Sequence, residues 1–408
     1  MQPNMIAKSQ IFKCSFSRLK HNTPRKKGEK LMNQNVAIFS AVFIVFIVAA
    51  GLAAFIIETR NPSQHEENFS VVVTDALGRT VQINLPIERV IITGKSGWPI
   101  TSVAYMFPSA ENRLYGLSPQ TASIQLFRMV DPAIDSKTSS DLGSNSPNIE
   151  ELAAANPDVV ILKTSMKNQI GDPLEALGIN VVYVDFENLD SYVRDVKVIG
   201  KIFENAAKAD EIAEYYEEKY DNTLSKTASL VTENRPKVLL LYYNAQGGTV
   251  SFNAPGAGWL QTSMIDAAGG YALSNELAGT GWNTISFEQI AQWDPDIIFT
   301  VTYSGNPSAS SVKDNLLADS TWTGITAVKN GKVYAVPHDC SNIAAIGSWD
   351  NPCSRWILGQ LWMAKKIQPS LFANLDLAEE AKEFYMRWYG LDENNATTIV
   401  NQITGDLQ

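Results

Sequence analysis

One stretch of this sequence occurs twice, and that repetition constrains the fold more than any other feature. Residues 148–162 read NIEELAAANPDVVIL, and residues 286–300 repeat the pattern as SFEQIAQWDPDIIFT, at an offset of 138 residues without gaps. Each copy starts with an Asn or Ser that favours a helix N-cap, and Glu151 or Gln289 follows three residues later, which predicts a capping box. A Pro-Asp pair then ends the helix before an apolar run typical of a buried strand. We therefore expect two similar lobes.

Glu150 and Glu288 occupy equivalent positions in the two copies, two residues after the N-cap. The free amide groups and the dipole at the start of a helix favour a carboxylate there. Stabilisation of the two helices is therefore one sufficient explanation for both residues.

Charge is distributed unevenly along the 408 residues, a length sufficient for two domains and a terminal segment. Residues 1–57 contain eight Lys or Arg and one acidic residue, which leaves 25 basic and 42 acidic residues, or a net charge of -17, in the remainder. An acidic main body disfavours nucleic acid and anionic membranes as partners. Three Cys and three His are too few for a metal cluster made from these residues alone, so no metal site is predicted.

An uncharged run at residues 36–57 would extend about 33 Å as a helix, enough to cross the hydrocarbon core of a membrane. It is interpreted as a transmembrane anchor or a signal helix, cleaved or retained. Basic residues precede it and acidic residues follow it, which places the main body outside the cytoplasm. Residues 1–35 are then a cytoplasmic segment or partly untranslated, with translation starting at Met32, and residues 58–68 form a linker.

Apolar strands alternate with helices in two blocks that we interpret as an N-terminal lobe, residues 69–189, and a C-terminal lobe, residues 231–408. Because the strands are continuously apolar rather than alternating, the sheets are expected to be mainly parallel and covered on both faces. In the first lobe we expect a hairpin over residues 71–85, strands at 89–93, 114–117 and 180–186, and a helix at 99–107. In the second lobe we expect strands at 238–243 and 333–336, a tight turn at Asn330-Gly331, and helices at 352–367 and 377–389.

Residues 190–230 connect the two lobes. No Pro interrupts the stretch from Asp190 to Ser229, and its apolar residues recur at intervals of three and four. This spacing predicts one long helix or two collinear helices, which would act as a stiff interdomain connection.

Several motifs together resemble the substrate-binding proteins of ABC importers, in the class with a rigid interdomain helix that carries iron-siderophore, haem or cobalamin cargo. The resemblance extends over residues 69–390. It rests on Asp75-x-x-Gly78-Arg79, Pro86-x-x-Arg89-Val90, the first copy of the repeat, and Trp322–Val336 with its segment Ala327-Val328-Lys329-Asn330-Gly331-Lys332-Val333-Tyr334. The family resemblance implies an α/β fold of two lobes with the ligand in the cleft between them.

The resemblance also implies a permease, and through it an ATPase, as partners of a monomeric protein outside the cytoplasm. It implies that one carboxylate on the tip of each lobe docks onto arginines of the permease, and Glu150 and Glu288 are the matching positions. A capped glutamate can pair with Arg in bidentate geometry, and two such points fix an orientation that one point cannot.

Aromatic residues near the ends of strands are the main candidates for ligand contact. In parallel α/β lobes, the loops after the carboxyl ends of the strands form the ligand crevice. Aromatic rings there can stack on a planar ligand, although packing explains any single one of them. The candidates are Trp98, Tyr243, Trp259, Trp282, Tyr303 and Trp349, with residues 244–259 interpreted as one of the loops.

Four further residues have open interpretations. Arg355 could contact an anionic group of the ligand or form a surface ion pair. His338 could contact a ligand or have a structural role only. Cys340 and Cys353 could form a disulfide in an oxidising exterior or stay as thiols.

The identity of the cargo stays open at this point. Haem would need an axial Tyr243, Tyr303 or His338. An acidic siderophore would need several cations, and the loops offer few. An iron chelate or a cobalamin-like ligand is expected, with a small oxyanion or another metal chelate as the alternative.

An enzyme and a binding module without a transporter are the two alternatives to import. The sequence contains no nucleophile elbow, no Gly-Lys-Ser/Thr phosphate loop and no His/Glu metal motif, so an enzyme is not expected. A surface-anchored sensing or scavenging module without a transporter remains as an alternative.

Overall fold

The computed structural model describes residues 69–246, 249–279, 281–303, 305–340 and 344–408. The predicted N-terminal segments at 1–35, 36–57 and 58–68 lie outside these residues. Within the described ranges, no helix combines the length and the apolar character needed to cross a membrane.

The N-terminal lobe begins with the predicted hairpin, in which β1 (Ser70–Thr74) pairs antiparallel with β2 (Thr80–Asn84). Its turn explains the Asp-x-x-Gly-Arg motif. Asp75 Oδ1 accepts hydrogen bonds from the amides of Leu77 and Arg79, both at 3.0 Å, and Gly78 takes the left-handed conformation with φ +73°. The Arg79 guanidinium then pairs with Asp75 and Glu175, which fixes the hairpin to the rest of the lobe.

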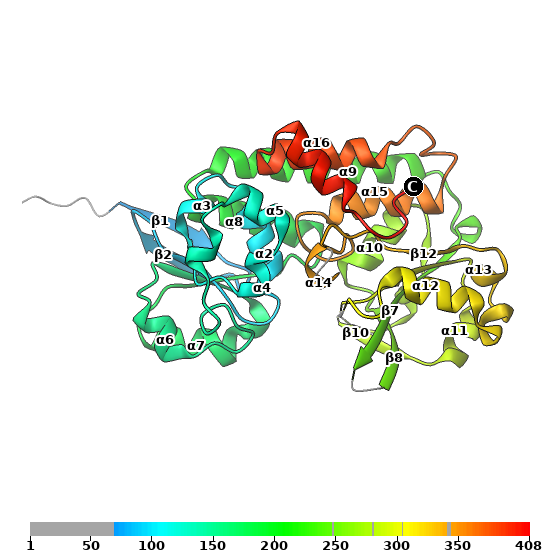
Figure 1. Cartoon of the computed structure of the whole chain (residues 1–408), viewed down its shortest axis with the longest axis horizontal. Helices are drawn as coiled ribbons and strands as arrows, with labels where there is room; N and C mark the ends of the chain where they lie inside the picture. The colour runs from blue at the N-terminus through cyan, green and yellow to red at the C-terminus, as the bar shows by residue number, and fades with distance from the viewer. Residues whose placement is uncertain (1–68, 247–248, 280, 304, 341–343) are drawn as a thin grey trace, which may run out of the picture. The chain divides into compact units, whose positions relative to one another are not determined.

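A four-stranded, entirely parallel sheet forms the centre of the N-terminal lobe, as predicted. In sheet order its strands are β4 (Leu114–Tyr115), β3 (Val90–Ile92), β5 (Val159–Lys163) and β6 (Val181–Val184). Every residue of β3, β5 and β6 is buried, which is why these strands are continuously apolar with Lys163 as the exception. Helix α2 (Gly97–Ala104) follows β3 and packs against the sheet (Figure 1).

The C-terminal lobe contains a six-stranded mixed sheet in the order β10-β8-β7-β11-β12, with β9 also paired to β7. The strands are β7 (Lys237–Gln246), β8 (Thr249–Pro255), β9 (Tyr271–Ala272), β10 (Trp282–Ile285), β11 (Ile297–Val301) and β12 (Val333–Ala335). β7 is parallel to β9 and β11, and β12 is parallel to β11, as expected, whereas β8 and β10 are antiparallel. The interpretation of residues 244–259 as a loop is therefore wrong, because this polar stretch belongs largely to the β7–β8 hairpin (Figure 1).

The repeat forms the helix and strand that its sequence predicts in both lobes. Helix α6 (Ile149–Ala154) precedes β5, and helix α11 (Phe287–Trp293) precedes β11. Asn148 Oδ1 accepts from the amide of Glu150 at 2.8 Å, and Ser286 Oγ accepts from the amide of Gln289 at 3.2 Å.

The Pro-Asp stop also acts in the same way in both copies. A left-handed residue, Asn156 (φ +47°) or Asp294 (φ +45°), precedes each Pro-Asp pair. Asp158 then accepts the amide of Arg89 just before β3, and Asp296 accepts the amide of Lys237 at the start of β7, each at 2.8 Å. Each stop therefore joins its own strand to the neighbouring parallel strand.

The connection between the lobes differs from the prediction of one long or two collinear helices. It consists of α8 (Leu189–Ile202) and α9 (Ala206–Thr227), which pack against each other. Glu204 is left-handed with φ +53°, and Asn205 accepts the amide of Lys208 at 3.2 Å to cap α9. A side chain at Gly200 would approach Ala209 Cβ to 2.3 Å, so close packing of the two helices requires this glycine.

Three helices complete the chain: α15 (Trp356–Ile367), α16 (Leu377–Tyr389) and α17 (Glu393–Asn401), the last of which was not predicted. Helix α15 contacts α9, α10 (Leu260–Ala267) and α16 (Figure 1). Nearly every residue of α15 is buried, including Gln360. This helix therefore forms the centre of the C-terminal helical layer.

Candidate functional site

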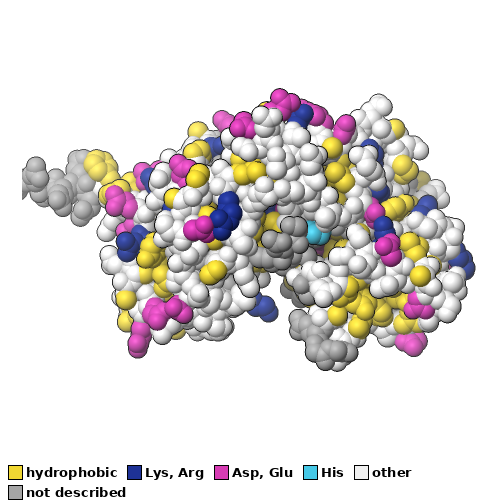
Figure 2. All heavy atoms as spheres, viewed as in Figure 1, with side chains coloured by type: hydrophobic (Ala, Val, Ile, Leu, Met, Phe, Trp, Pro, Cys, Tyr) yellow, Lys and Arg dark blue, Asp and Glu magenta, His cyan; other side chains and the backbone are white. Residues whose placement is uncertain are grey.

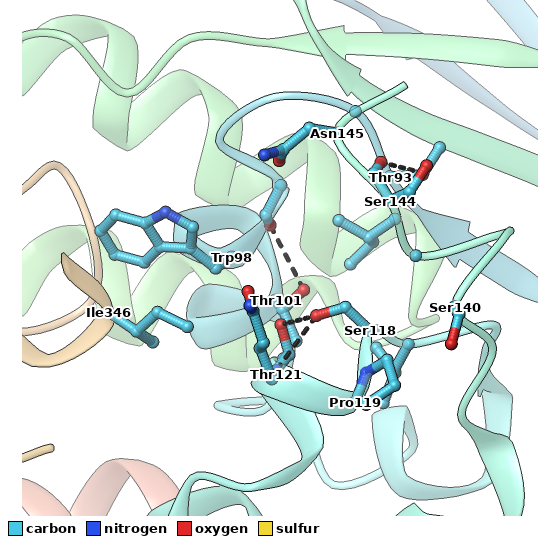
Figure 3. A pocket seen from close by; sticks show the side chains of 16 residues that line it. Thr93, Trp98, Thr101, Ser118, Pro119, Thr121, Ser140, Ser144, Asn145 and Ile346 are labelled. Atoms are coloured by element: carbon cyan, nitrogen blue, oxygen red, sulfur yellow. Dashed lines mark hydrogen bonds between the residues drawn. The ribbon is translucent and has the colours of Figure 1, made fainter. Parts of the chain in front are cut away.

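A pocket of about 420 Å³ opens at the carboxyl ends of β3 and β4, where the family resemblance predicts the ligand crevice (Figure 3). Its walls come from the end of β3, the first half of α2, residues 117–121 and residues 140–145. Ile346 is the one lining residue that lies after the C-terminal sheet in the chain. The pocket therefore belongs mainly to the N-terminal lobe.

The lining of this pocket is polar but uncharged. Its polar side chains are hydroxyls and amides: Thr93, Thr101, Ser118, Gln120, Thr121, Ser140, Ser144 and Asn145. None of the described residues that line it is a Lys, Arg, Asp or Glu. Such a lining offers hydrogen-bond donors and acceptors without a net charge.

The hydroxyls of Ser118 and Thr121 are hydrogen-bonded to each other beside the pocket (Figure 3). Ser118 Oγ accepts the amide of Thr121 at 3.0 Å and donates to Thr121 Oγ1 at 2.8 Å. Among the described residues the Thr121 hydroxyl accepts this bond and donates none, so its proton can point into the pocket. Ser118 also caps α4 (Pro119–Ala122), so the local turn fixes both side chains.

The start of α2 also faces the pocket through Gly97, Trp98 and Thr101. A helix N-terminus favours negative charge because its first amides are free. Here the amide of Gly97 already donates to Gly94 O at 3.2 Å, and Pro99 has no amide proton. This helix end therefore offers fewer donors than an ordinary one.

Trp98 lies in the first turn of α2, at the wall of the pocket beside Ile346 (Figure 3). Its ring is partly buried. A role in ligand binding stays a prediction for this residue.

Three of the predicted aromatic residues, Trp259, Trp282 and Tyr303, come together in the C-terminal lobe with Tyr242. Trp282 lies 5.3 Å from Trp259, 5.1 Å from Tyr242 and 5.7 Å from Tyr303, measured between ring centroids. All four side chains are partly exposed. We call these four residues the aromatic cluster.

Tyr243 lies on the other face of β7 from its neighbour Tyr242, because successive side chains of a strand point to opposite faces. Its ring packs 5.9 Å from Phe252, and both residues pack against a core cluster that does not include the four aromatic residues. Ligand contact by Tyr243 stays a prediction, and this residue lies apart from the aromatic cluster.

Tyr303 is held in place by a buried carboxylate. Its hydroxyl donates to Asp350 Oδ2 at 2.5 Å, and the hydroxyl of Ser348 donates to Oδ1 of the same residue. Burial raises the pKa of the Asp350 carboxyl, while these hydrogen bonds oppose the increase. Burial and then the Asp350 charge raise the pKa of Tyr303 well above its ordinary value, so this tyrosine stays protonated.

Arg355 is neither at the surface nor in the pocket, contrary to both interpretations from the sequence. Its side chain is fully buried, and Nε lies 3.0 Å from Asp339 Oδ2, at an angle that makes an ion pair rather than an aligned hydrogen bond. Its Nη2 donates to Ile346 O at 2.7 Å and its Nη1 to Ser354 Oγ at 3.2 Å. A buried guanidinium with these partners has no face free for a ligand.

His338 and Trp349 also have structural surroundings. His338 Nδ1 lies 3.0 Å from Cys340 O and Nε2 lies 2.6 Å from Thr404 Oγ1, so both ring nitrogens are engaged. Trp349 is fully buried. These contacts favour the structural interpretation of both residues over ligand contact.

Cys340 and Cys353 are both buried free thiols. Burial raises the pKa of each thiol, which keeps both protonated and unreactive. In the described part of the chain, no three His, Cys, Asp or Glu side chains group as a metal site would require.

Glu150 and Glu288 are both exposed at the first turns of α6 and α11. The pKa of Glu288 is lowered by its own backbone amide first and then by the hydroxyl of Ser286. These positions match the predicted symmetric placement, one in each lobe.

Comparison with known proteins gives consistent matches over most of the described chain. The family model described as periplasmic binding protein matches residues 126–340. The molybdate-binding protein MolA of Haemophilus influenzae is 25% identical over 268 residues, which are 60% of this chain and 70% of that protein. The Fe(3+)-citrate-binding protein YfmC of Bacillus subtilis is 24% identical over 315 residues, 75% of this chain and 90% of that protein.

A solved structure also shares the fold. The periplasmic solute binding protein from Veillonella parvula has a TM-score of 0.64 and 27% sequence identity. The match covers 82% of this chain and 97% of that one.

Proposed function

Since this chain belongs to the periplasmic binding protein family and is the substrate-binding component of an ABC importer, we propose that it captures a small oxyanion of the molybdate kind. The observation that carries this proposal is the uncharged hydroxyl lining of the pocket beside α2. An oxyanion spreads its charge over several oxygens, and each can accept a hydrogen bond from a hydroxyl or amide. A lining without carboxylates does not repel such a ligand. The molybdate-binding relative from Haemophilus influenzae supports this choice.

An iron chelate or a cobalamin-like ligand is the second candidate, and the aromatic cluster favours it. Partly exposed Tyr and Trp rings offer flat apolar surface to the organic part of a chelate. The relative named for Fe(3+)-citrate supports this candidate. Haem is less well supported, because the hydroxyl of Tyr303 and both nitrogens of His338 already have partners, and Tyr243 faces a core cluster.

Calorimetric titration of the purified protein separates these candidates. Molybdate and tungstate are compared with sulfate, ferric citrate, a ferric hydroxamate, cyanocobalamin and haemin. We expect heat of binding with molybdate and tungstate. Saturable binding of a ferric chelate or of cyanocobalamin, with none for the two oxyanions, would replace the first candidate by the second.

Delivery to the permease is proposed to use Glu150 and Glu288. Both side chains are exposed, and α6 and α11, which carry them, are drawn at the lower edge of the view in Figure 1, one in each lobe. Figure 2 shows acidic side chains along that edge. Arginines of a permease could pair with both carboxylates at once and so orient the binding protein.

The proposal also covers the arrangement of the two lobes, the N-terminal segment and the oligomeric state of the protein. Helix α9, which continues from α8 and contacts α10 and α15, would keep the two lobes in a fixed arrangement. Residues 36–57 would anchor the exported protein to the membrane or direct its export. We propose a monomer that carries its ligand without a catalytic step.

A further inference from the structure

A buried polar network joins α2 of the N-terminal lobe to the helices of the C-terminal lobe. Ser102 of α2 donates through Oγ to Ser354 Oγ at 3.0 Å, and the amide of Ser354 donates back to Ser102 Oγ at 2.9 Å. Tyr389 of α16 donates to Ser102 O at 2.8 Å, and Tyr216 of α9 donates to Ser354 O. Ser102, Ser354 and Tyr216 are fully buried, and Tyr389 is 6% exposed. Helices α2, α9 and α16 and the segment just before α15 therefore meet at one pair of serines.

Arg355 extends this network to a second wall of the pocket. Its guanidinium contacts Ser354 Oγ, Asp339 and the carbonyl of Ile346. Tyr385 of α16 donates to the same carboxylate of Asp339, which fixes that anion from the other side. Ile346 follows the C-terminal sheet in the chain and lines the pocket, so Arg355 connects the network to the pocket.

The network thus holds two separate pieces of the pocket. Ser102 follows Thr101, a lining residue on the same short helix as Gly97 and Trp98. Ile346 comes from a different segment of the chain and lies beside Trp98 at the pocket (Figure 3). Neither Ser102, Ser354 nor Arg355 lines the pocket itself.

We propose that Ser354 and Arg355 are positioning residues of the ligand site: Ser354 fixes α2 through Ser102, and Arg355 fixes Ile346 through its carbonyl. The placement of α2 and of Ile346 at the pocket is then set by two adjacent residues just before α15. This inference rests on the proposed function, since it takes the pocket as the ligand site. Arg is suited to this role because its planar fork can donate in several fixed directions at once, which Lys cannot do.

Hydrogen exchange measured by mass spectrometry on the full chain tests the mechanical part of this proposal without a ligand. Ser102→Ala removes the link between α2 and Ser354, and its matched control is Ser274→Ala. That control removes another buried serine pair, in which Thr262 Oγ1 lies 2.7 Å from Ser274 Oγ, at a place that does not line the pocket. Exchange is compared well below the melting temperatures of both variants.

We expect amides of residues 97–104 to exchange at least about five-fold faster in Ser102→Ala, because both buried hydrogen bonds of Ser102 Oγ are lost, and to be unchanged in Ser274→Ala. Equal exchange of this segment in the two variants would overturn the proposal. If Ser102→Ala does not fold, Ser354→Ala takes its place, because it also removes the bond between the two side chains.

Molybdate is the probe for the functional part. We expect Ser102→Ala to bind molybdate about five-fold more weakly than the wild type, with Ser274→Ala unchanged. Faster exchange of α2 with unchanged molybdate affinity would overturn the assignment of Ser354 as a positioning residue. If the wild type does not bind molybdate, the proposed oxyanion function fails, while the exchange comparison still decides whether the network holds α2.

Discussion

The guanidinium of Arg355 and the carboxylate of Asp339 form an ion pair at 3.0 Å in which both side chains are excluded from solvent. Such a pair contributes little more to the free energy of unfolding than two apolar side chains would, because each ion loses its hydration when it is buried. Removing one partner alone is much worse, since the other charge is left buried without compensation. The pair is therefore a sensitive point in the stability of the C-terminal lobe.

From this relationship we expect Arg355→Met to lower the free energy of unfolding by about 3–5 kcal/mol. Urea denaturation followed by circular dichroism measures the effect. Adding Asp339→Asn to Arg355→Met should recover part of the loss, because it removes the uncompensated charge. A loss in Arg355→Met no larger than that of an exposed control such as Arg128→Met would contradict this account. Arg128 pairs with Asp135 at the surface.

The hydroxyl of Thr121 is expected to contribute directly to oxyanion binding. Thr121→Val keeps the shape of the side chain and removes the free donor, so the affinity for molybdate should fall about ten-fold. Isothermal titration calorimetry measures the change. Thr398→Val is the matched control, because Thr398 is exposed on α17 and donates to Asn394 O far from the lining residues. Equal affinities for the two variants would remove Thr121 from the site.

Docking to the permease should depend on two glutamates together. We expect the double variant Glu150→Ala and Glu288→Ala to reduce ATP-dependent uptake by about ten-fold, because the interface loses both charged contacts. Ligand affinity measured on the isolated protein should stay the same. The control is Glu151→Ala with Gln289→Ala, which changes the next residue in each helix. Unimpaired uptake with the double glutamate variant would show that these residues only stabilise their helices.

The stability of the protein should decrease as the pH falls below about 6.5, in part because of His338. Burial is the largest influence on the pKa of His338 and lowers it below the ordinary value, with Asp339 and the carbonyl of Cys340 acting in the opposite direction. Between the folded and the unfolded pKa, the unfolded chain binds more protons than the folded chain. The contribution is therefore present in full above the unfolded pKa and is lost as the pH falls through the folded pKa.

Melting temperatures at pH 7.5 and 5.5 test this expectation. The decrease between the two pH values should be smaller in His338→Gln than in the wild type, because glutamine does not titrate. Other groups that titrate in this range contribute equally to both proteins and cancel in the comparison. The same decrease in both proteins would show that His338 does not contribute.

Local signals in the sequence predicted the frame of both lobes well. The repeated cap, helix and Pro-Asp stop produced α6, β5, α11 and β11 where expected, because N-caps, Pro and continuous apolar runs act over a few residues. The parallel order of the N-terminal sheet followed from the same patterns. The break between α8 and α9 was missed because Asn205 is a cap inside a long apolar periodicity that favours continuation.

Site residues were harder to predict than elements. Tyr242 was not predicted to join Trp282 and Tyr303, because only the pairing of β7 with β8 decides which face of the strand each of two adjacent tyrosines occupies. The polar residues Ser118 and Thr121 of the pocket lie in a loop after an expected strand, where the crevice was expected, but nothing singled them out individually, because Ser and Thr are common in loops.

By itself, the sequence determined two α/β lobes and an exported binding protein of an ABC importer, because these conclusions depend on short-range patterns and on their order along the chain. Only the tertiary structure decided the role of Arg355, whose partners Asp339 and Ile346 are near in the chain but whose link to Ser102 spans both lobes. The sequence left Arg355 as a ligand contact or a surface cation, whereas the structure buries it at the centre of an internal network. Burial depends on how distant segments pack, and no local pattern records it.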